Sequence, residues 1–296
     1  MNNSFDASLR LFDAVWTRYA NDFEEAERFD LKRYLGEPSL GATSHLEAIT
    51  PMQSRILDEG ITTLILCDKH FSNYERNAQR NAFLAQLSRA IERAICIRSM
   101  LRTGYEEAAR AVSRSFLDSI DVALACLVDR KFSTEFLSFK RSANNLWKKK
   151  IGQEEIDAYL IAACKIAGLD EAEAEDFVKE RKNQKTLLSD FIHADSCGTF
   201  LSSHTPVLSY SDKFSFERYR AANSHTMGHI LLIAGEVQKF LFILIGSLTS
   251  GWKEHPFEAI TTGKDIDSFL SQAAAYQDFY YKHSFPVVGG VSVASI

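Results

Sequence analysis

The chain has 296 residues, of which 46% are hydrophobic and 25% are charged, and its formal net charge is -5. This composition is ordinary for a soluble globular protein and supplies enough apolar residues for the core of one large domain or two smaller ones. The negative net charge excludes a molecule that attracts nucleic acid as a whole, so any contact with nucleic acid needs a local basic patch.

The cysteines and the first residues bear on the cellular compartment. Five cysteines are spread widely without a C-x-x-C pair. An odd number of cysteines among apolar residues indicates reduced core thiols in a cytosolic protein. The opening residues, MNNSFDASLR, have neither a basic flank nor an apolar run, so we expect no secretory signal. We therefore predict a cytoplasmic protein.

The distribution of proline predicts the fold class. No proline occurs between Pro51 and Pro206, and glycine is sparse in that stretch. Proline breaks helix interiors, and alternating β-branched runs bounded by turn pairs are absent. The sequence therefore predicts an all-α protein, a multi-helix bundle with long central helices.

The first expected helix covers residues 4–29 and precedes the loop EPSLGATSH. A helical region follows at 51–102. Apolar residues recur at the i, i+3, i+4 period in this region and again in the next expected helix, 105–129. Another helix is expected at 134–148. These segments form the first half of the predicted bundle.

The second half begins with a helix expected at 154–167, with Gly168 as its C-terminal cap. Asp170 and Glu173 resemble a capping box, which opens a further helix. We expect that helix to break in the polar run KERKNQK, residues 179–185, whose basic side chains indicate a solvated face.

A long loop at 197–215 leads to the principal helix, 216–249, and a last helix is expected at 265–282. The most apolar stretch, residues 230–248, is interrupted by Glu236 and Lys239, so we interpret it as a buried helix and expect no membrane contact. The final residues, FPVVGGVSVASI, predict a loose or a docked tail. The expected organisation is an N-terminal helix and loop (1–50), a main helical bundle (51–250), and a C-terminal helix and tail (251–296).

The principal helix carries a polar strip. Arg218, His225, His229 and Glu236 follow one another at spacings of seven, four and seven residues, which places them along one narrow line. Such a strip either reaches water or meets polar groups of a neighbouring helix, where hydrogen bonds satisfy the histidines. This structural interpretation stands beside two chemical hypotheses.

The first chemical hypothesis is ribonuclease activity. An arginine followed by four to six residues and then a histidine is similar to the motif of the HEPN superfamily, all-helical domains of toxins and antiviral systems. The resemblance implies that Arg218 or Arg220 acts with His225 at the scissile phosphate of RNA, without a metal and across a dimer. The residue after the arginine is often polar in that family, whereas Tyr219 and Ala221 follow here.

The second chemical hypothesis is metal binding. His225 and His229, four residues apart on a helix, can share a metal ion. His193 stands in a D-x-x-H pattern with Asp190, a spacing found in carboxylate-bridged di-metal bundles, but a second E-x-x-H is missing. Our first expectation is no metal and no cofactor, and the alternative takes His193, His225 and His229 as ligands.

Arg114 and Asp118 form an i, i+4 pair in very apolar surroundings, so we expect a partly buried pair that fixes helix packing. The segment around this pair, residues 87–140, resembles a family of bacterial helical proteins catalogued as a domain of unknown function. That family shows R-S-x-x-E, matched here with Asp118 in place of Glu, and a later S-x-x-x-H that is similar to Ser189 and His193. The resemblance implies a helical bundle and suggests, by analogy, mobile and defence-associated bacterial loci.

Together these patterns predict a helical interaction or scaffold module within a bacterial antiviral defence or toxin-like system. The apolar surface of residues 230–248 must be covered within the chain or by another copy, so we expect a homo-oligomer or a partner protein. The first alternative is a metal-independent HEPN-type endoribonuclease that acts on RNA phosphates. The second is a metal-dependent helical-bundle enzyme.

Overall fold

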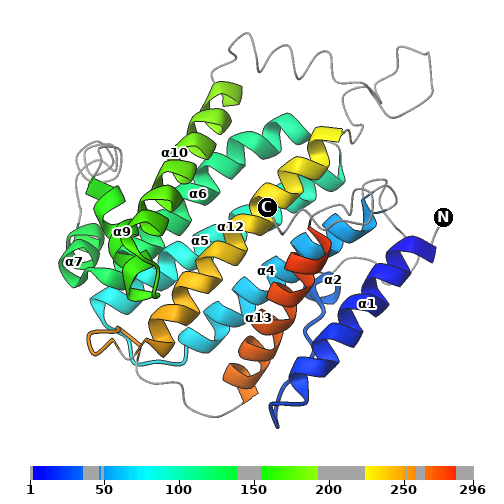
Figure 1. Ribbon diagram of the computed structural model, residues 1–296, viewed down its shortest axis with the longest axis horizontal. Coiled ribbons are helices and arrows are strands. Elements are labelled where there is room, and N and C mark those ends of the chain that lie inside the picture. The colour runs from blue at the N-terminus through cyan, green and yellow to red at the C-terminus, as the bar shows by residue number, and fades with distance from the viewer. Residues whose placement is uncertain are drawn as a thin grey trace.

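The computed structural model of the protein is a bundle of α-helices (Figure 1). It describes residues 3–35, 47, 50–103, 105–138, 155–192, 224–250, 252–257 and 264–284. Within these ranges there are ten helices and no strand, which confirms the predicted all-α fold.

Five helices form the main body. They are α4 (Pro51–Phe71), α5 (Ala78–Arg102), α6 (Glu106–Val128), α12 (Ser224–Thr249) and α13 (Lys264–His283). The remaining helices are α1 (Asn3–Ala20), α2 (Leu31–Tyr34), α7 (Arg130–Ser138), α9 (Glu155–Ile166) and α10 (Glu171–Ile192). In Figure 1, α1 lies beside α13 at one edge, α7 and α9 lie at the other, and α12 runs through the middle. The central helix α12 packs on α4, α6, α9 and α13.

The helical region predicted at 51–102 is divided into α4 and α5. Pro51 stands at the start of α4, where its missing N–H costs no hydrogen bond. Asn77 is the N-cap of α5, and its side chain accepts a hydrogen bond of 2.9 Å from the Arg80 backbone N–H. A buried ion pair then ties the two helices together, with Arg98 Nε 2.5 Å from Asp58 Oδ1.

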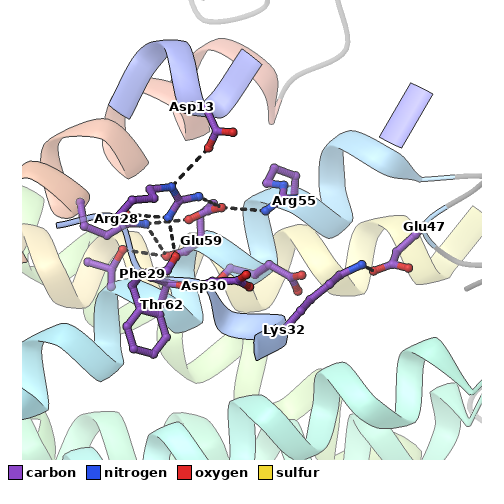
Figure 2. Close-up of polar contacts among 12 residues, drawn as sticks. Asp13, Arg28, Phe29, Asp30, Lys32, Glu47, Arg55, Glu59 and Thr62 are labelled. Carbon is purple, nitrogen blue, oxygen red and sulfur yellow. Dashed lines mark hydrogen bonds and ion pairs between the residues drawn. The ribbon is translucent and has the colours of Figure 1, made fainter. Parts of the chain in front are cut away.

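The prediction of one helix over residues 4–29 is wrong, because α1 ends at Ala20. The next residues are held in a non-helical path by contacts with distant helices. The Glu27 backbone N–H donates to Ser268 Oγ at 2.9 Å, and the Arg28 guanidinium lies 2.6 Å from Glu59 Oε1 on α4. Figure 2 shows Arg28 between Asp13 and Glu59, with Arg55 on the far side of the same carboxylate.

The expected break in KERKNQK is also wrong, because α10 is continuous from Glu171 to Ile192. Its predicted start is confirmed. The Asp170 and Glu173 side chains each accept a hydrogen bond of 2.9 Å from the other's backbone N–H. Gly168 has a φ of 100°, a left-handed conformation that favours glycine after a helix end.

The helix α12 approaches its neighbours closely. A Cβ atom on Gly246 would stand 2.8 Å from the backbone oxygen of Ala167, which follows α9. The segment Thr226–Thr249 is long and apolar enough to cross a membrane by length and composition, but 67% of its most apolar part is buried in the bundle. Burial of this kind is what a core helix requires.

Candidate functional site

A row of polar contacts joins α6 to α12 through the inside of the bundle. We call this row the α6–α12 seam; its residues are Glu106, Ser113, Asp121, Thr226, His229 and Glu236. The contacts follow the same order along both helices, so α6 and α12 run in the same direction. The seam places the His229–Glu236 part of the predicted polar strip against neighbouring helices.

The first contact of the seam, which we call its outer end, lies at the start of α6 and of α12. The Thr226 hydroxyl donates to Glu106 Oε2 at 2.5 Å, and the same carboxylate forms an ion pair with Arg110 one turn further along α6. The backbone of His225 belongs to the first turn of α12. Of the other residues predicted for RNA cleavage, Arg218 and Arg220 lie outside the described residues, as does the His225 side chain.

In the middle of the seam, His229 and Ser113 form a buried pair with 2.7 Å between Nε2 and Oγ. The Ser113 hydroxyl donates to the backbone oxygen of Ala109 at 2.8 Å. A hydroxyl has one proton, so the proton between the two side chains comes from His229 Nε2. His229 is therefore not placed to take a proton from Ser113, and the pair lacks the arrangement of a nucleophile and its base.

The charge state of His229 follows from the same position. Burial and, to a smaller extent, the nearby positive charge of Arg110 together lower the pKa of His229 to about 3. At neutral pH the imidazole is uncharged, which removes the cost of a buried charge beside Arg110. His229 thus serves as a neutral hydrogen-bond donor.

The inner end of the seam is a cluster of charges from three helices. The Arg181 guanidinium of α10 lies 3.4 Å from Asp121 Oδ1 on α6 and contacts Glu236 on α12. Lys185 lies 2.5 Å from Asp121 Oδ2 and 2.7 Å from Asp118 Oδ1. We call this set the Arg181 cluster; its members are Arg114, Asp118, Asp121, Glu180, Arg181, Lys185, Glu236 and Lys239.

The Arg181 cluster is internally balanced, with as many cationic as anionic side chains. Burial opposes the positive charge of Arg181, but Asp121 and Glu236 outweigh it, so the pKa of Arg181 is raised. Such a cluster is costly to break, because loss of one partner leaves a buried charge without compensation. It joins α6, α10 and α12.

The predicted pair of Arg114 and Asp118 is present, with 3.7 Å between the guanidinium and the carboxylate. Asp118 is closer to Lys185, so α10 shares this carboxylate with Arg114. The Ser189 hydroxyl donates to the backbone oxygen of Lys185 within its own helix. His193 lies outside the described residues.

Sequence patterns did not identify Ser113 as a residue of the seam, nor Arg181 and Lys185 as residues of the Arg181 cluster. Arg181 and Lys185 belong to KERKNQK, which was predicted to be a solvated face, yet Arg181 is buried. The available signal was the row of acidic residues on a very apolar helix, Asp118 and Asp121, which required cations from another helix. The spacing of residues within α10 could not show that Arg181 and Lys185 are the cations that pair with these carboxylates.

Metal ligands and thiols are further groups that could carry chemistry in this bundle. Across the described ranges, no group of three or more His, Cys, Asp or Glu side chains could hold a metal ion. The four described cysteines are free thiols. Burial raises the pKa of Cys126 to about 12 and that of Cys164 to about 11, which keeps both thiols protonated at neutral pH.

Comparison with protein-family models, with curated proteins and with solved structures finds no match to this chain.

Proposed function

We propose that this chain is a helical interaction module that binds a second copy of itself, within a bacterial antiviral defence or toxin-like system. The binding surface, which we call the α12–α13 face, is formed by the exposed Phe242 of α12 and Tyr281 of α13, together with the partly buried Leu231 and Ile245 of α12. The defence setting rests on the resemblance of residues 87–140, and the binding surface rests on the exposure of apolar side chains.

The observation that carries the proposal is the distribution of polar and apolar residues around α12. Glu236 is 1% exposed, whereas Phe242, less than two turns along, is 44% exposed. A helix of a monomeric globular protein normally buries its aromatic residues and exposes its charges. On α12 the Glu236 carboxylate is paired inside the bundle, whereas the large aromatic side chain of Phe242 lies at the surface.

The apolar side chains of this face share one side of α12, where Phe242 is exposed and Leu231 and Ile245 are partly buried against the core. At 100° per residue, Leu231, Phe242 and Ile245 fall within about 60° of one another. Gln238 lies on the same line and donates a hydrogen bond of 2.8 Å to the hydroxyl of Tyr281, which is 57% exposed. Tyr281 therefore extends the α12 surface onto α13.

A surface of this composition is suited to protein association. Phenylalanine and tyrosine are enriched in protein–protein interfaces, and clustered exposed apolar residues mark interaction sites. In a two-fold dimer the same face of both copies forms the contact, so a single helix can supply most of the interface. Catalysis by the α6–α12 seam has less support, since Ser113, His229 and Glu236 are buried and paired.

Light scattering of the purified full chain over a wide concentration range tests this proposal. We expect the mean mass to rise with concentration, and we expect Phe242→Asp to lower the association constant at least about tenfold, because a charge replaces an apolar contact. Leu11→Asp is the matched control, since Leu11 is 48% exposed on α1 and lies outside the face. It should associate as the unchanged chain does.

Two results would overturn the proposal. One is a monomeric mass at every concentration. The other is equal association of the unchanged chain and Phe242→Asp, which would place any interface elsewhere.

A metal-independent endoribonuclease is a second candidate, favoured by the position of His225. Because the described part of α12 begins at Ser224, His225 lies in its first described turn, and the N-terminal end of a helix dipole favours a phosphate. Glu106 and Arg110 lie beside that turn through the Thr226 contact. Arginine and histidine side chains near this point would have charges suited to RNA cleavage.

Incubation with total RNA in EDTA tests the second candidate. We expect the unchanged chain to degrade RNA and His225→Ala to lose that activity. His283→Ala is the control, since His283 lies at the end of α13. Equal RNA decay with the unchanged chain and with His225→Ala would discard the assigned site.

A further inference from the structure

Helices α5 and α6 pack against each other, and one contact between them fixes an arginine beside a serine. Arg93 Nε of α5 donates a hydrogen bond of 2.7 Å to Ser115 Oγ of α6, and Arg93 Nη1 donates to the backbone oxygen of Arg89 at 3.1 Å. These two bonds orient the guanidinium. Its Nη2 group bonds to none of the residues that the structure describes, so these N–H donors are available to a ligand.

The Ser115 hydroxyl also has a proton to donate. Ser113 and Ser119, on the same helix, donate their hydroxyl protons to the backbone oxygen one turn earlier, at 2.8 Å and 3.0 Å. Within the described ranges, Ser115 Oγ accepts the bond from Arg93 and donates to no group. Ser115 is partly exposed, so a ligand at the surface can accept this proton.

The two arginines give this part of the surface a positive charge. Arg89 is exposed and Arg93 is partly buried, and neither forms an ion pair with a described residue. Burial and the positive charge of Arg89 lower the pKa of Arg93, although Glu92 and Asp118 act in the opposite direction. Asp118 already pairs with Lys185 at 2.7 Å, which leaves the exposed Glu92 against two arginines. An anion at this point would therefore be attracted.

The donors of this surface suit a phosphate group. Arginine binds phosphate oxygens through paired N–H groups, and residues four apart on a helix have Cβ atoms ~5–6 Å apart, so Arg89 and Arg93 can bind one phosphate together. A phosphate monoester carries a charge of about −1.5 to −2 at pH 7, which matches two arginines better than the single charge of a nucleic-acid phosphodiester. The charge therefore favours a terminal phosphate.

We propose that Arg89, Arg93 and Ser115 bind the phosphate group of a small phosphate monoester, with the Arg93 guanidinium and the Ser115 hydroxyl as its donors. These residues form what we call the α5–α6 site. The proposal gives a role to the serine of the R-S-x-x-D pattern at Arg114-Ser115. The α5–α6 site shares no residue with the α12–α13 face, so either proposal can fail without the other.

Isothermal titration calorimetry of the full chain tests the α5–α6 site, at about 0.15 M salt, where attraction between exposed charges is screened. The probes are inorganic phosphate, adenosine monophosphate and adenosine. We expect the first two to bind and adenosine not to bind. Tighter binding of adenosine monophosphate than of phosphate would identify a nucleotide as the ligand, and equal affinities would assign recognition to the phosphate group alone.

The same titrations of two variants test the assigned residues. Arg93→Gln and Ser115→Ala should each weaken binding about tenfold or more, because each removes a hydrogen bond to a charged group. Ser115→Ala keeps both arginines, so its effect separates a built site from general attraction to positive charge. Arg10→Gln changes an exposed arginine of α1 and is the matched control, which should bind as the unchanged chain does. Circular dichroism checks that all three variants keep the helical fold.

Three results would overturn the inference. The first is no binding of either phosphate or adenosine monophosphate. The second is equal affinity of the unchanged chain, Arg93→Gln and Ser115→Ala. The third is an oligoribonucleotide without a terminal phosphate that binds more tightly than adenosine monophosphate and is weakened by Arg93→Gln, which would assign the surface to a nucleic-acid backbone.

Discussion

Ser113 on α6 and His229 on α12 meet inside the bundle, with 2.7 Å between Oγ and Nε2. Burial, with the nearby charge of Arg110, lowers the pKa of His229 to about 3 in the folded protein, whereas the same side chain has a pKa near 6.5 in the unfolded chain. The folded protein therefore keeps this histidine neutral at neutral pH. This difference links proton binding to the free energy of unfolding.

The first prediction concerns pH. Between pH 6.5 and pH 3 the unfolded chain binds a proton on His229 that the folded protein does not, so stability is fully present above pH 6.5 and is lost as pH falls. From pH 7 to pH 5, urea denaturation should show that the unchanged chain loses roughly 2 kcal/mol more than His229→Gln. Burial also lowers the pKa of His70, His255 and His283. These residues are present in both the unchanged chain and His229→Gln, so their contribution cancels in the difference. An equal loss in both would contradict the assignment to His229.

The second prediction concerns the Arg181 cluster. Arg181→Met should lower the free energy of unfolding by ~3–5 kcal/mol, because it removes the buried cation that Asp121 and Glu236 share and leaves the cluster with one negative charge in excess. Lys182→Met is the matched control on the next residue, where a half-exposed ion pair with Asp157 contributes about 1 kcal/mol or less. Chemical denaturation measures both. A similar small effect in the two variants would show that Arg181 is not needed to hold α6, α10 and α12 together.

The third prediction compares two glycines of α12. Gly246→Ala should destabilise the protein by ~1–3 kcal/mol, since the new Cβ would stand 2.8 Å from the backbone oxygen of Ala167 and force the helices apart. Gly228→Ala meets nothing within 4 Å and should stabilise by ~0.5–1 kcal/mol through helix propensity. Thermal and urea unfolding should give opposite signs. The same sign for both would mean that α12 does not approach the end of α9 this closely.

The fourth prediction concerns the contact that holds residues 21–30. Arg28→Met removes hydrogen bonds to Glu59, Gln272 and the backbone oxygen of Phe29, and should cost about 1.5–3 kcal/mol. Limited proteolysis should then cut within 21–30 sooner. Arg18→Met, which removes an exposed ion pair of 3.6 Å with Asp278, is the control and should leave the cleavage rate unchanged. Equal cleavage of the two variants would assign the path of this segment to other contacts.

The sequence by itself determined the helical elements and several of their ends. Gly168, the Asp170–Glu173 capping box and the apolar period of residues 105–129 act within a few residues of chain, so local geometry suffices to recognise them. The polar strip containing His229 and Glu236 was visible for the same reason.

Only the tertiary structure decided what each polar side chain meets. The cations in KERKNQK are buried or solvated according to whether carboxylates from other helices reach them, and Asp121 and Glu236 are both distant in sequence. Residues 21–30 leave the helical conformation because Ser268 and Glu59 offer hydrogen bonds that a local pattern does not contain. A charge is stable inside a protein only with its partner in place, and the partner is brought by folding.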